Sequence, residues 1–163
     1  MSLPAHLLEA VAAAAVREGL ADAVYTRIET PIGPLTVVQG VHGVVRIGFA
    51  EEALDRLLAE VAAGLGPRII ASDTELAATR DAIDAYFAGE DETLALPVDF
   101  SLVHSPFRRA ALEELRTVGA GSVITSGGLA ARIGHPRAAR AIGTACARNP
   151  IPIVMQSVKV EER

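Results

Sequence analysis

Three arginines and a threonine near the end of the chain recur at intervals of three or four residues: Arg137, Arg140, Thr144 and Arg148. This spacing places their side chains on one stripe of a helix expected over residues 137–148. The other side of that helix is small and apolar, and is expected to face a core through Ala138, Ala141, Ile142 and Ala145. Guanidinium groups gathered on one helix face can neutralise phosphates, so the pattern predicts a DNA-contacting helix. A solvated amphipathic helix is the alternative interpretation.

Nucleophilic and metal-binding side chains are scarce. The single cysteine, Cys146, falls four residues after Ile142 on the inward side, where we expect a buried thiol that behaves as a small hydrophobe. One cysteine cannot form an internal disulfide, and the four histidines show no ligand spacing. We therefore expect no metal site and no cofactor.

The charges divide unequally along the chain. Residues 1–100 hold 6 basic and 16 acidic side chains, a balance near −10, whereas residues 101–163 hold 9 basic and 4 acidic, a balance near +5. A basic half inside an acidic protein is typical of a nucleic-acid-binding module whose remainder does not touch phosphate. Chance clustering of arginines is the alternative.

Length and composition bound the architecture. A chain of 163 residues that is 50% hydrophobic can bury a core, as one compact domain or as two small ones. No apolar run approaches the roughly 20 residues of a bilayer span. The alanine-rich opening lacks the basic start and cleavage site of a secretion signal. We expect no membrane association and a cytoplasmic location.

The first half predicts a helix, a small antiparallel sheet and two further helices. The first helix is expected over residues 3–18, and strands over 24–29, 35–39 and 44–49, separated by short glycine-bearing turns. Apolar residues at helical spacing predict a helix over 51–63 that stops at Gly64. Ser72 and Glu75 form a capping box for a helix that ends before Gly89.

The second half predicts a helical domain. We place the boundary near residue 100, which gives domains 1–100 and 101–163. Ser105 is expected to cap a helix that begins at Pro106 and runs to about residue 117. A short helix over 128–133 ends at Gly134, and the turn 134–136 leads into the basic helix. This is the spacing of a helix-turn-helix.

Two motifs carry a family resemblance. Residues 135–143 read HPRAARAIG and residues 149–154 read NPIPIV. Both closely resemble the methylated-DNA-protein-cysteine methyltransferases, the O6-alkylguanine-DNA alkyltransferases that take an alkyl group off the O6 atom of guanine. Residues 30–35, TPIGPL, match a segment common in the N-terminal domain of that family. The resemblance implies an α+β fold, with a small antiparallel sheet domain with helices followed by a helical, winged-helix-like DNA-binding domain.

The resemblance also implies roles for individual residues. The basic helix would enter the minor groove, and Arg140 would occupy the space left by a flipped guanine. Asn149 matches an asparagine that supports the turn between this helix and the active-site segment, and so would act as a structural hinge. The family has a tyrosine that helps to rotate the target phosphate where this chain has Ser126, so Ser126 joins the expected DNA-binding positions as a small replacement.

The acceptor position departs from the family. Family members read Pro-Cys-His-Arg-Val where residues 156–160 here read Gln-Ser-Val-Lys-Val. Ser157 therefore stands at the acceptor cysteine, and Val158 at the histidine that activates it through a water. A thiolate is accessible near neutral pH and strongly nucleophilic, whereas a hydroxyl without an adjacent base is neither. The family glutamate that completes this network lies in a tail that we expect this chain to lack. We expect no catalytic residue and a scaffold inactive in methyl transfer.

Three hypotheses follow for function. The first is a DNA-binding homologue linked to alkylation repair, similar to the alkyltransferase-like proteins that lack the cysteine. It would bind double-stranded DNA, with alkylated guanine as a candidate lesion and a repair protein as a candidate partner. The second is a protein-interaction or regulatory module on the same scaffold. The third is an altered or truncated form of an active methyltransferase.

Overall fold

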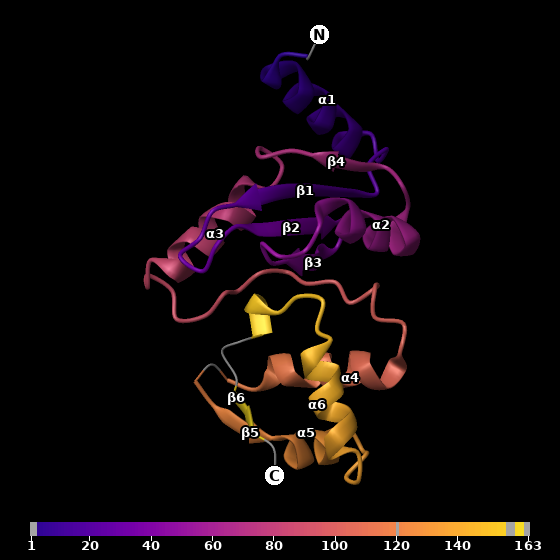
Figure 1. Ribbon diagram of the computed structural model, residues 1–163, viewed down its shortest axis with the longest axis vertical. Helices are drawn as coiled ribbons and strands as arrows, with labels where there is room; N and C mark the ends of the chain where they lie inside the picture. The colour runs from indigo at the N-terminus through magenta and orange to yellow at the C-terminus, as the bar shows by residue number, and fades with distance from the viewer. Residues whose placement is uncertain (1–2, 120, 156–158, 162–163) are drawn as a thin grey trace. The chain divides into compact units, whose positions relative to one another are not determined.

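The computed structural model describes residues 3–119, 121–155 and 159–161. The chain forms two compact units, Met1–Leu102 and Val103–Arg163 (Figure 1). Both units mix helices and strands, so the α+β class is confirmed. Among the described residues, no helix combines the length and the apolar character needed to cross a bilayer.

The first unit is built on a four-stranded sheet with strand order β3-β2-β1-β4. Strands β1 (Ala23–Ile28), β2 (Leu35–Gly40) and β3 (Gly43–Gly48) form an antiparallel meander, and each boundary lies within one residue of the predicted one. Strand β4 (Ile69–Ala71) was not predicted, and it pairs with β1 in parallel. The sheet is therefore mixed, because the chain crosses from β3 to the opposite edge before it forms β4.

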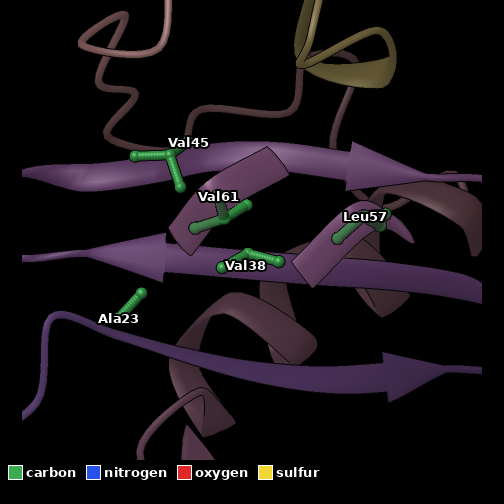
Figure 2. Packing of buried hydrophobic residues seen from close by; sticks show 5 residues of the cluster. All are labelled: Ala23, Val38, Val45, Leu57 and Val61. Carbon is green, nitrogen blue, oxygen red and sulfur yellow. The ribbon is translucent and has the colours of Figure 1, made fainter. Parts of the chain in front are cut away.

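Helix α2 (Leu54–Leu65) covers one face of this sheet. Figure 2 shows Ala23, Val38 and Val45 from the three long strands facing Leu57 and Val61 from α2, and all five side chains are buried. The predicted helix began three residues too early and stopped at the wrong glycine. The difference at the C-terminal end arises from the roles of Gly64 and Gly66.

Gly64 and Gly66, near the end of α2, are each required for a different steric reason. Gly66 follows the helix with a φ of 125°, a conformation that favours glycine, and it is the true stop. Gly64 lies inside the helix, where an added Cβ would come within 2.3 Å of the Cδ2 atom of Leu102. Gly64 therefore serves side-chain packing and does not end the helix.

Helix α3 (Ala77–Phe87) covers the opposite face. The Thr79 hydroxyl donates to the Gln39 side chain of β2 at 2.7 Å, and Leu76 and Ile83 are buried. The predicted capping box is only half formed. The Ser72 hydroxyl accepts from the Glu75 N–H at 3.1 Å. The Ser72 N–H, which a complete capping box would bond to the Glu75 side chain, instead donates to a carbonyl of β1, and a turn precedes the helix.

Helix α1 (Ala5–Arg17) is attached to the start of that turn. The Glu9 carboxylate accepts from the Ser72 hydroxyl at 2.5 Å and from the Asp73 N–H at 2.9 Å. These hydrogen bonds, with that of Ser72 as the largest cause, hold the pKa of Glu9 below its usual value. The helix packs inward through Ala12 and leaves several larger apolar side chains, among them Val11, exposed.

The extended segment after α3 completes the first unit. Leu94, Leu96 and Phe100 are buried. Val44 on β3 donates its N–H to the Pro97 carbonyl and accepts from the Asp99 N–H. This short parallel bridge covers the outer edge of β3.

The second unit packs three helices around a small core. Helix α4 (Pro106–Thr117) begins as predicted, since the Ser105 hydroxyl accepts from the Arg108 N–H and Pro106 takes the first position. Strand β5 (Val123–Thr125) leads into helix α5 (Ser126–Arg132), and helix α6 (Ala139–Ala147) follows. A 3-10 turn (Ile153–Met155) precedes strand β6 (Lys159–Glu161), which pairs with β5 in parallel. The core of this unit is apolar and includes Leu112, Leu115, Leu129, Ile142, Ala145, Ile151 and Ile153.

Candidate nucleic-acid interface

The basic helix is shorter than the sequence predicted. Helix α6 begins at Ala139, and Arg137 lies before it in a turn closed by the Ala138 N–H and the His135 carbonyl at 2.9 Å. The proline after His135 disfavours a helical conformation at that residue, and no side chain caps the start of α6. Arg148 is the C-terminal cap residue and not part of the last helical turn. Arg137 and Arg148 therefore flank the helix.

The exposed face of α6 is narrow and mostly made of short side chains. Arg140, Ala141, Thr144, Ala147 and Arg148 are exposed, whereas Ile142 and Ala145 are fully buried. The prediction that Ala141 faces the core was wrong, because the helical rotation places it beside Arg140 on the outer side. Short side chains next to an arginine let the helix backbone come close to a partner surface, with the guanidinium as the longest group.

The charged groups of this face are available to an external anion. Within the described residues, none of the guanidinium groups of Arg137, Arg140 and Arg148 takes part in an ion pair. The Thr144 hydroxyl lies 3.3 Å from the Arg140 carbonyl and donates back to its own helix. The α6 face and the turn before it therefore present three cations that form no ion pair with another described residue, and one hydroxyl whose proton is already used.

The chain turns immediately after α6, and the Asn149 side chain stabilises this turn. The Asn149 Oδ1 atom accepts from the Ile151 N–H at 2.9 Å, and its Nδ2 atom donates to the Ile151 carbonyl at 3.2 Å. These two bonds bracket Pro150, which has no N–H of its own to offer. This is the position that the sequence assigned to a structural hinge.

Ser126 does not lie on the surface. It is the first residue of α5, is 4% exposed, and its hydroxyl has no hydrogen-bond partner among the described residues. A buried hydroxyl cannot reach a phosphate, so the expected direct DNA contact of Ser126 does not hold in this conformation. The neighbouring Thr125 caps α5 by accepting from the Gly128 N–H at 2.9 Å.

The remaining reactive groups offer no assembled catalytic centre within the described residues. Ser157 and Val158, the expected acceptor and activating positions, lie outside those residues. Cys146 is half-buried, and burial raises the pKa of its thiol, so it is a poor nucleophile near neutral pH. No group of three or more acidic, histidine or cysteine side chains in the described part of the chain is arranged to hold a metal ion.

One contact between α4 and the end of α6 was not predicted. The Arg108 side chain of α4 reaches across the unit, and its Nη2 atom donates to the Arg148 carbonyl at 2.7 Å. The two residues are 40 positions apart in the chain, and no sequence pattern links them.

Fold and site together define a two-unit protein whose second, basic unit exposes an arginine-bearing helix. Residues 106–160 match the family described as 6-O-methylguanine DNA methyltransferase, DNA binding domain. Residues 23–100 match 6-O-methylguanine DNA methyltransferase, ribonuclease-like domain. The chain belongs to the methylated-DNA-protein-cysteine methyltransferase family.

Individual relatives agree with this assignment. The methylated-DNA--protein-cysteine methyltransferase of Shigella flexneri is 34% identical over 137 residues, which cover 82% of this chain and 79% of the relative. The constitutive enzyme of Bacillus subtilis is 29% identical over 142 residues, covering 83% and 79%. The crystal structure of Mycobacterium tuberculosis OGT in complex with DNA is similar, with a TM-score of 0.67, 27% identity, and coverage of 85% of this chain and 78% of that one. The chain is therefore a homologue of DNA alkyltransferases.

Proposed function

We propose that this protein binds double-stranded DNA through the exposed face of α6, senses bases that leave the helix easily, and does not accept an alkyl group. Alkylated guanine is the lesion that the family points to, and a repair protein is the candidate partner. No cofactor is part of the proposal, and the cytoplasm is the proposed location. Residues 1–100 would support the fold, and residues 101–163 would contact DNA.

The observation that carries the DNA proposal is the position of Arg140. It lies on the exposed face of α6, forms no ion pair with another described residue, and falls inside the segment that matches the family's DNA-binding domain. An arginine beside short side chains is suited to enter the minor groove and to occupy the space of a displaced base, which offsets part of an unstacking cost of a few kcal/mol. Arg137 and Arg148 supply phosphate contacts on either side.

The absence of transfer rests on the residues at the acceptor position. Alkyl transfer breaks the carbon–O6 bond of guanine and forms a bond from that carbon to the nucleophile, so it requires a strong nucleophile. Ser157 offers a hydroxyl, and its neighbour Val158 cannot remove the proton. The half-buried Cys146 does not supply the missing thiolate.

A second candidate function is a protein-interaction or regulatory module that no longer binds DNA. The buried hydroxyl of Ser126 favours it, because the family's phosphate-rotating tyrosine is replaced by a side chain that cannot reach DNA. An altered form of an active methyltransferase is a third candidate, because the replacement of the acceptor cysteine by Ser157 would by itself account for the loss of transfer.

Two measurements separate these candidates. Fluorescence anisotropy with matched duplexes that carry guanine or O6-methylguanine measures binding and lesion preference. Intact-mass measurement of the protein after incubation with the methylated duplex measures transfer. Salt-dependent binding without a gain of one methyl group supports the proposal. Absence of binding at low ionic strength supports the interaction module, and stoichiometric methylation refutes the inactive scaffold.

A further inference from the structure

Arg108 connects two helices of the second unit through its side chain. It sits in the first turn of α4, and its side chain is half-buried. Its Nη2 atom donates to the Arg148 carbonyl at 2.7 Å, and its Nε atom is buried with no partner among the described residues. The guanidinium is thus committed to the end of α6.

The end of α6 lacks two of the features that usually satisfy the last carbonyls of a helix. No basic side chain occupies its last turn, and no glycine with a positive φ follows it, whereas α5 ends at Gly134 with a φ of 80°. The last carbonyls of a helix have no partner within the helix, and they carry the negative end of its dipole. The Arg108 guanidinium of α4 donates a hydrogen bond to the Arg148 carbonyl and also places a positive charge at the negative end of the helix dipole.

The contact also lies at the junction between two parts of the proposed interface. Arg148 contributes an exposed guanidinium, and the next residue, Asn149, forms the side-chain turn that leads away from the helix. The Arg148 backbone is therefore held on one side by Arg108 and on the other by the turn at Asn149.

We propose that Arg108 is a positioning residue that fixes the C-terminal end of α6, so that Arg148 is presented to DNA in one orientation. Arg108 itself does not contact phosphate. The inference rests on the proposed function for its effect on DNA binding, but the effect of Arg108 on the helix end is independent of DNA.

The first test measures the helix end without DNA. In the Arg108→Gln variant, hydrogen exchange of the Arg148 and Asn149 amides should accelerate about tenfold, the change given by about 1.4 kcal/mol from a lost charge-assisted hydrogen bond. The Gly134 amide at the end of α5 should not change. Arg108→Lys retains a cation and a donor and should restore much of the protection. Unchanged exchange at Arg148 and Asn149 in Arg108→Gln would overturn the inference, whether or not the protein binds DNA.

The second test is a double-mutant cycle of DNA affinity. Arg108→Gln should weaken binding several-fold in the wild-type background and cause no further loss in an Arg148→Ala background, because a positioning residue acts through its partner. Arg116→Gln, on the exposed end of α4, is the charge-matched control and should have little effect. Additive losses in the cycle would show that Arg108 contacts phosphate directly, and would refute the positioning role. If the wild-type protein does not bind DNA, the proposed function fails and the exchange measurement still decides the role of Arg108.

Discussion

Removing single arginines from the α6 face should change the salt dependence of DNA binding by a calculable amount. Three exposed guanidinium groups flank or occupy this face, those of Arg137, Arg140 and Arg148, and none of them forms an ion pair with another described residue. If each neutralises one phosphate, the slope of log K against log salt concentration is about −2.7, because each phosphate contributes about −0.9. Affinity would then fall about 40-fold between 50 and 200 mM salt, and about 12-fold in a variant that has lost one contact.

The assay is an anisotropy titration of a labelled duplex at four or more salt concentrations. Arg137→Ala and Arg148→Ala should each flatten the slope by about 0.9 for any sequence. Arg140→Ala should in addition remove most of any preference for an O6-methylguanine or mismatched duplex, since unstacking is least costly there. Arg56→Ala, on the exposed side of α2 in the acidic unit, removes the same charge and serves as the control.

Three results would refute parts of this reasoning. A slope that is unchanged in all three α6 variants would mean that another surface neutralises the phosphates. Equal flattening by Arg56→Ala would mean that net charge, and not the α6 face, determines binding. Retained lesion preference in Arg140→Ala would remove the base-sensing role from that residue.

Three further predictions concern the acceptor position, the acidic unit and α1. Ser157→Cys should transfer methyl groups only slowly, because a thiol with a pKa near 8.5 and no assisting base is mostly protonated at pH 7; intact mass against time measures it. Neutralising the exposed Asp91 and Glu92 should strengthen DNA binding slightly, and a clear weakening in the titration would contradict the division of labour. Because the pKa of Glu9 is lowered in the folded state, its ionised carboxylate stabilises the fold at pH values above its ordinary pKa, and this contribution is lost as pH falls through the lowered pKa. After correction for intrinsic rates, hydrogen exchange of the Asp73 amide should therefore accelerate on acidification. In Glu9→Gln, which has no carboxylate to protonate, the same acidification should not change the exchange of this amide.

Periodicity and turn residues identified the regular elements of the fold. The meander β1 to β3 was predictable because each strand is long enough to alternate and is bounded by glycine-bearing turns. Helix α4 was predictable because Ser105 and Pro106 are strong local signals for a helix start. In contrast, the three residues of β4 are too few to show a period, and only their pairing with β1 makes them a strand.

The sequence identified the segment that carries the candidate site, but it could not show which residues of that segment are exposed. Helical spacing placed Arg140 correctly outward, but it could not show that Ala141 is exposed as well, because alanine fits either environment. The family resemblance assigned Ser126 to the DNA surface, whereas a small side chain at that place is enclosed by the core. The bond from Arg108 to the Arg148 carbonyl depends on tertiary packing between α4 and α6, which no local pattern encodes.

The covered edge of β3 has a consequence for how the two units can be separated. The segment after α3 looks like a linker, yet its residues 97–99 bond to Val44, and an added Cβ at Gly43 would come within 2.5 Å of the Pro97 carbonyl. An open strand edge is a template for pairing with other chains and leads to aggregation. A fragment that stops before residue 94 would expose this edge, whereas one that extends to Leu102 keeps it protected. We therefore expect shortened forms of the first unit to resist aggregation better when they retain the segment that joins it to the second.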